Sequence, residues 1–108
     1  MKNISCNIQF DSDDIAGYLF SNVAHQMGYH IRQWVPETDI HQDDVFYILV
    51  DASGKEAALI NWEQARIDIL GIFYDCFNNI QRAKSRVAKY LQHEVDDFDH
   101  AFGDYAVL

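Results

Sequence analysis

The first quarter of the chain predicts a strand followed by a helix. Apolar and polar residues alternate over residues 3–10, which is the two-residue period of a half-buried strand. The apolar members of this run are Ile4, Cys6, Ile8 and Phe10. Aspartates within residues 11–14 supply the capping oxygens and first-turn negative charge that begin a helix. Apolar residues then recur at helical spacing, and Gly28 is the expected end of this helix.

The next segment is expected to be extended and then irregular. Residues 29–35 precede Pro36, and a proline disfavours the helical conformation in the residue before it. Residues 37–44 have no apolar period and predict a polar loop, with room for one helical turn.

A hairpin is expected after this loop. Residues 45–50 form a continuous apolar run of the kind found in a central strand. Residues 51–55 predict a tight turn, in which Gly54 can adopt a positive φ. Residues 56–60 form the returning strand.

The C-terminal part predicts two helices. Asn61 and Gln64 have the spacing of a capping box. Apolar residues follow at three- and four-residue steps: Trp62, Ala65, Ile69, Phe73, Cys76, Ile80, Ala83, Val87, Leu91, Val95, Phe98 and Phe102. One uninterrupted helix over this stripe would be about 60 Å long, which is too long for a domain this small to cover. We therefore expect a break near Asn78 and Asn79.

These elements predict a single α+β domain over residues 1–108. A small antiparallel sheet of three or four strands carries one N-terminal helix and two C-terminal helices, in the order β-α-β-β-β-α-α. With 49% hydrophobic and 23% charged residues, the chain has the composition of a packed globule. There are two cysteines, no secretion signal and no apolar run of membrane-spanning length, so a cytoplasmic protein with reduced thiols is expected.

The net charge of the chain limits the classes of partner that are expected. Seventeen acidic residues against eight basic ones give a net charge of -9, which repels nucleic acid and anionic membranes. The favoured partner is a basic protein surface, such as the cleft with which a nuclease or another nucleic-acid-binding protein holds its substrate. Aromatic side chains supply the affinity in such contacts. The predicted partner-binding residues are Asp39, Asp43, Asp44, Glu94, Asp96, Asp97 and Asp99, with Trp34 and Tyr90 as aromatic anchors.

Catalytic and cofactor motifs are absent from the sequence. It has no glycine-rich phosphate loop, no serine-centred elbow and no paired-cysteine spacing, so neither catalysis nor a cofactor is expected. The weak candidates for metal ligands are His93, Asp97 and His100. On a helix His93 and Asp97 are four residues apart, as are Asp96 and His100, and side chains at this spacing can reach one ion. A solvated acidic helix face explains the same residues without a metal.

A basic cluster precedes the acidic segment of the last helix. It consists of Arg82, Lys84, Arg86 and Lys89, half of all basic residues in the chain. These residues either neutralise neighbouring carboxylates such as Asp68 and Asp75, or they bind an acidic partner or a second subunit. The apolar end at residues 106–108 also permits self-association as a homodimer.

In size, acidity, aromatic content and lack of a catalytic motif, the chain resembles the small inhibitors of phages and mobile elements. These include anti-CRISPR and anti-restriction proteins, and the chain is equally similar to the immunity proteins of nuclease toxins. The resemblance is one of general character over the whole chain and carries no individual residue across. It implies a protein-binding inhibitor that blocks the basic site of a nucleic-acid-handling protein. The alternatives are an assembly protein that self-associates through the C-terminal helix and a small metal-binding protein or enzyme that uses residues 93–100.

Overall fold

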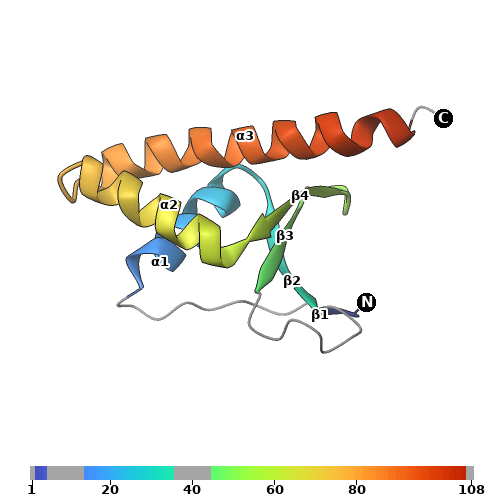
Figure 1. Ribbon diagram of the computed structural model, residues 1–108, viewed down its shortest axis with the longest axis horizontal. Helices are drawn as coiled ribbons and strands as arrows, with labels where there is room; N and C mark the ends of the chain where they lie inside the picture. The colour runs from blue at the N-terminus through green and yellow to red at the C-terminus, as the bar shows by residue number, and fades with distance from the viewer. Residues whose placement is uncertain (1, 5–13, 36–44, 107–108) are drawn as a thin grey trace.

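The chain folds as the predicted α+β arrangement, as a computed structural model shows (Figure 1). The structure describes residues 2–4, 14–35 and 45–106. Its elements are β1 (Lys2–Ile4), α1 (Ile15–Gln26), β2 (His30–Val35), β3 (Phe46–Val50), β4 (Glu56–Asn61), α2 (Trp62–Asp75) and α3 (Ile80–Ala106). The predicted loop at 37–44 and most of the predicted strand at 3–10 lie outside the described residues.

The strands form one antiparallel sheet in the order β1-β2-β3-β4. In its register Ile31 lies opposite Leu49, and Leu49 lies opposite Ala58. All three side chains belong to the main hydrophobic core or pack against it, as side chains on one face of a sheet do. Neighbouring positions such as Ile48 and Leu59 point to the other face.

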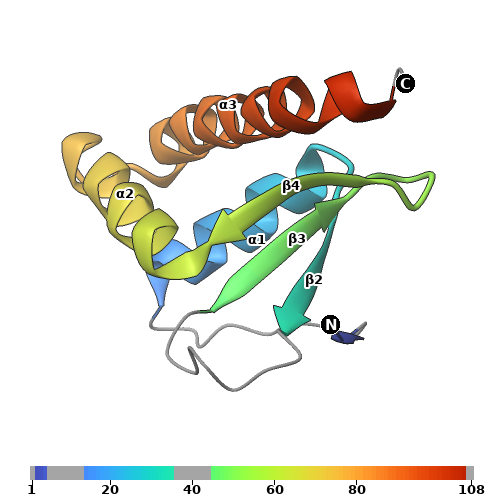
Figure 2. The same ribbon diagram turned by 45° about the vertical axis from the view of Figure 1, so that its right-hand side comes forward.

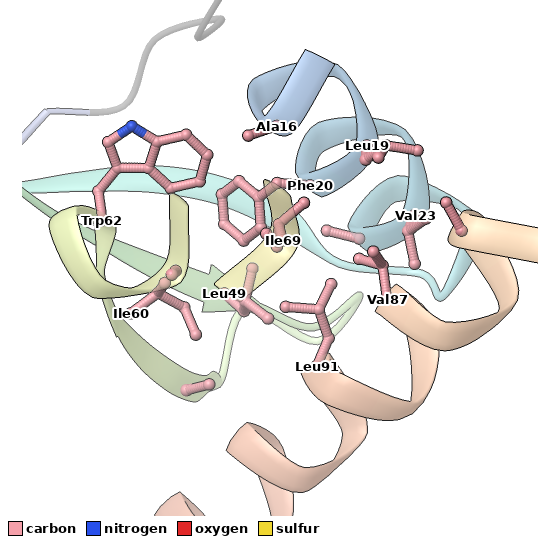
Figure 3. Close-up of a cluster of buried hydrophobic side chains, with 14 of the residues drawn as sticks. Ala16, Leu19, Phe20, Val23, Leu49, Ile60, Trp62, Ile69, Val87 and Leu91 are labelled. Atoms are coloured by element: carbon pink, nitrogen blue, oxygen red, sulfur yellow. The ribbon is translucent and has the colours of Figure 1, made fainter. Parts of the chain in front are cut away.

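All three helices cover the same face of the sheet and enclose the core with it (Figure 2). Phe20 of α1, Ile69 of α2 and Leu91 of α3 are fully buried around Leu49 of the central strand β3 (Figure 3). The Phe20 ring lies 5.1 Å from the Trp62 ring, centroid to centroid. These contacts join four elements that are far apart in sequence.

Local signals set the helix ends much as the sequence predicts. The Asp14 carboxylate accepts a hydrogen bond from the Gly17 amide at 3.0 Å and caps α1. Gly28 follows the end of α1 with a φ of 93°, which glycine adopts without a steric cost. The Asn61 side chain caps α2 through the amides of Glu63 and Gln64.

The predicted break in the C-terminal stripe is a turn between α2 and α3. Phe77 and Asn78 both adopt left-handed backbone conformations, with φ values of 54° and 60°. The Asn79 side chain then accepts a hydrogen bond from the Arg82 amide at 3.1 Å and begins α3. The chain therefore reverses direction within a few residues, so that both helices can pack on the sheet.

Helix α3 has 27 residues and is therefore about 40 Å long, close to the 45 Å longest dimension of the molecule. Figure 1 shows it crossing the whole width, with the α2–α3 turn at one end. None of the described helices is both long enough and apolar enough to cross a membrane.

Truncating Leu91 tests whether α3 contributes to the core. Leu91→Ala should lower the free energy of unfolding by about 2–5 kcal/mol, because it removes a fully buried side chain and leaves a cavity. Ile67→Ala is the control, since Ile67 is 63% exposed, and it should change stability by less than about 0.5 kcal/mol. Urea unfolding followed by circular dichroism measures both. Equal effects of the two substitutions would contradict the packing of α3.

Candidate partner-binding surfaces

The buried stripe of α3 fixes which of its side chains face solvent. Ala83, Val87 and Leu91 are fully buried, and Val95 and Phe98 continue the same side half-buried against the core. Arg82, Arg86 and Lys89 are exposed in the first half of the helix, as are Asp96, Asp97 and Asp99 in the second. These six charged residues of α3 are therefore available to a partner.

The charged residues of α3 are arranged against its helix dipole. Basic residues lie near the start of the helix, and acidic residues lie beyond its middle. The N-terminal end of a helix is partially positive and the C-terminal end partially negative, so basic residues are unfavourable near the start. Arg82 nevertheless lies in the first turn, and the last turn contains no basic residue. Self-stabilisation of the helix does not explain this arrangement.

A cluster of acidic side chains forms where the second half of α3 lies near α2. The Tyr90 hydroxyl donates a hydrogen bond to the Asp68 carboxylate at 3.3 Å. Burial raises the pKa of the half-buried Glu94 carboxyl, and the charges of Asp97 and Asp68 raise it further. Burial, with Glu94 and Asp68, also raises the pKa of Tyr90. Asp96 and Asp99 are exposed on other sides of the same part of α3. We call Asp68, Glu94, Asp96, Asp97 and Asp99 together the acidic patch.

Other carboxylates have structural roles instead. Asp14 caps α1. The Asp51 carboxylate accepts hydrogen bonds from the Ser53 hydroxyl at 2.6 Å and from the amides of Ser53 and Lys55, both at 3.0 Å, in the β3–β4 turn. These bonds, the one from the Ser53 side chain foremost, lower the pKa of Asp51. Asp14 and Asp51 therefore hold a helix cap and a turn, a role that the carboxylates of the acidic patch do not have. Asp39, Asp43 and Asp44 lie outside the described residues.

The basic cluster does not neutralise the acidic patch. Within the described part of the chain, no lysine or arginine forms an ion pair with a carboxylate. Asp68 instead accepts hydrogen bonds from Gln64 and Tyr90. Asp75 lines a hollow of about 340 Å³ beside the α2–α3 turn together with Arg82 and Arg86.

The metal-ligand candidates do not assemble into a site. His93, Asp97 and His100 are all exposed on α3. Among the described residues, no group of three or more histidine, cysteine, aspartate or glutamate side chains is placed to hold a metal ion. Cys76 is a free thiol buried behind the Arg86 guanidinium, and Cys6 lies outside the described residues.

The two aromatic anchors expected from the sequence are both engaged within the fold. Trp34 is half-buried, and its ring lies 5.2 Å from the Phe46 ring in an edge-to-face arrangement. Tyr90 is half-buried and bonded to Asp68. Their contacts within the chain leave less of each ring to a partner than the sequence-based hypothesis assumed.

Exposed apolar side chains gather elsewhere, on α2 and the turn after it. Ile67 is 63%, Tyr74 64% and Phe77 86% exposed. The sequence pattern of α2 could have indicated the exposure of two of them. Between the buried positions of α2, apolar Ile67 and Tyr74 recur on the opposite side at helical spacing, so the helix is apolar on two faces. The longer apolar stripe, which runs from α2 into α3, is the stronger pattern and obscures this second apolar face.

Comparison of the chain with protein-family models, curated proteins and solved structures finds no match. The function must therefore be inferred from these surfaces.

Replacing Glu94 by glutamine should stabilise the fold at neutral pH. A carboxyl whose pKa is higher in the folded than in the unfolded state binds more protons when folded. Stability therefore falls as the pH rises from the ordinary value of about 4.3 through the raised value. Glu94→Gln removes this loss. The substitution should therefore raise the free energy of unfolding by up to about 1 kcal/mol at pH 7 and by almost nothing at pH 4.

Chemical denaturation at the two pH values measures this difference. Glu56→Gln is the control, because Glu56 is an exposed glutamate outside the acidic patch, and the substitution should change stability by less than about 0.5 kcal/mol. A destabilised Glu94→Gln variant at pH 7 would contradict the crowding of carboxylates in the acidic patch.

Proposed function

We propose that the chain is a protein-binding inhibitor or modulator that uses the acidic patch to occupy a basic surface of a nucleic-acid-handling protein. The observation that carries this proposal is the segregation of charge on α3, where Asp96, Asp97 and Asp99 are exposed within one turn and form no ion pair with a lysine or arginine of the described residues. Such a concentration of negative charge is complementary to a site that binds phosphates.

The elements that present the acidic patch support this role. Glu94 and its neighbours lie on a helix whose inner side is anchored by fully buried side chains, and Asp68 lies on the adjacent helix. The carboxylates are therefore held in place before a partner arrives, which reduces the entropy lost on binding. The net charge of -9 adds attraction at long range. The cytoplasm, where such targets handle nucleic acid, is the compartment that this proposal implies.

Self-association through the apolar side of α3 has less support. The stripe that would form such an interface is buried from Ala83 to Leu91, where α3 packs on α1 and the sheet, and it is half-buried at Val95 and Phe98. The face that remains is charged.

Affinity capture with a charge-matched control tests the proposal. The chain is immobilised and exposed to extract of its source cells at low salt, and bound proteins are eluted with short duplex DNA. We expect a basic nucleic-acid-binding protein whose capture is lost above about 0.3 M salt, where exposed charges are screened within a few ångströms. The purified chain should inhibit that protein's binding to DNA or RNA.

The variants Asp96→Asn/Asp97→Asn and Glu56→Gln/Glu63→Gln change the net charge equally, and all four residues are exposed. Only the first pair should weaken capture, by at least about tenfold. Equal loss with both pairs would mean that net charge, rather than the acidic patch, attracts the partner. Capture that DNA does not displace would contradict the proposed target.

A further inference from the structure

Three features of α2 and the following turn oppose the stability of an isolated chain. The first is Gly71, which lies in the interior of α2, where glycine costs about 1 kcal/mol relative to alanine. Gly71 is exposed, and a Cβ at this position would have no atom within 4 Å, so no contact in the fold requires a glycine.

The second feature is the apolar stripe on the outer side of α2. Ile67 and Tyr74 are spaced seven residues apart, with Gly71 between them, so the three share one face of the helix. Both side chains are more than half exposed. A helix that is apolar on opposite sides is normally covered on both.

The third feature is Phe77, which adopts a left-handed backbone conformation with a φ of 54°. This conformation is strained for a bulky residue, and asparagine or glycine tolerates it better. Phe77 is also 86% exposed, so burial in the core does not offset the strain. Residues whose type is unfavourable for their local backbone or exposure are expected at a functional site when they occur together on one surface.

Basic side chains border this surface. Arg66 is exposed next to Ile67, and Arg82 and Arg86 line the hollow of about 340 Å³ to which Phe77 also contributes. A contact of 3.9 Å from the Arg86 guanidinium to the Cys76 sulfur holds Arg86 against the turn. Asp75 lies in the same hollow, which leaves two guanidinium groups against one carboxylate.

We propose that the outer face of α2 and the α2–α3 turn form a docking surface for an acidic, amphipathic segment of another protein. Apolar side chains of that segment pack on Ile67, Tyr74 and Phe77. Its backbone approaches closely at Gly71, and its carboxylates meet Arg82 and Arg86. The surface is distinct from the acidic patch, so this inference does not rest on the proposed function.

Charge selects this occupant over two others. In a symmetric dimer the same surface would meet itself, so the excess of arginine over carboxylate in the hollow would be present on both sides of the axis. An anionic membrane would be repelled by the net charge of -9. The carboxylates of an acidic protein segment are complementary in charge to the arginines. A short segment can also bind this one surface without lying along the acidic remainder of the molecule.

Two synthetic peptides of about 16 residues serve as probes, both amphipathic helices with the same leucine and phenylalanine positions. One carries glutamate on its polar face and the other lysine. We expect the glutamate peptide to bind at least about tenfold more tightly than the lysine peptide, as measured by isothermal titration. In NMR spectra the shifted amides should lie in residues 66–86. Equal affinities, no binding, or shifts centred elsewhere would overturn the proposal.

Variants separate binding from folding. Phe77→Asn and Gly71→Ala should each raise the urea midpoint of unfolding and weaken binding of the glutamate peptide at least about tenfold. Arg82→Gln/Arg86→Gln should weaken binding and reduce its dependence on salt. Leu59→Ala, on the other face of the sheet, truncates another exposed apolar side chain and should leave binding unchanged. A lowered midpoint for both Phe77→Asn and Gly71→Ala would show that these residues serve the fold and would overturn the proposal.

Light scattering and vesicle sedimentation test the other occupants with the full chain. We expect a monomer, and no binding to vesicles of phosphatidylcholine and phosphatidylserine. A dimer that Phe77→Asn dissociates would assign the surface to a second copy, and vesicle binding lost in the same variant would assign it to a membrane. Either result would overturn the acidic segment as the occupant.

Discussion

The packing of α3 on the core is the interaction on which the rest of the structure depends. Val87 and Leu91 are buried with α1 and β3, and together they fix the rotation of a helix almost as long as the molecule. Once that rotation is set, every other side chain of α3 has a fixed direction. The same contacts therefore stabilise the fold and hold the charged residues at the surface.

Much of the fold follows from local signals that agree with the tertiary contacts. The continuous apolar run at 45–50 predicted β3, and the turn at Gly54 predicted the return of the chain in β4. Gly28 marked the end of α1, and Asn61 marked the start of α2. The break between α2 and α3 was predicted by a different argument, from the size of the domain. The backbone conformation of this turn could not be predicted, because Phe77 is left-handed and phenylalanine disfavours that conformation.

The candidate binding surfaces were predictable only in part. The acidic residues of α3 could be identified because they are adjacent in sequence, but the contribution of Asp68 depends on how α2 packs beside α3. Trp34 and Tyr90 were chosen for residue type alone, and sequence does not tell how much of a ring is covered. Tyr74 and Phe77 were missed, because exposure on the second face of an apolar helix is decided by which face the core takes.

The two surfaces differ in charge and share one helix, because the basic residues of α3 lie near the α2–α3 turn and the acidic residues lie beyond the middle of the helix. This separation should persist in solution as a difference in electrostatic potential along α3. Paramagnetic relaxation of backbone amide protons by cationic and anionic nitroxides measures that potential residue by residue. We expect a strongly negative potential over residues 94–99 and a potential near zero or positive over residues 82–89. A uniformly negative potential along α3 would contradict it.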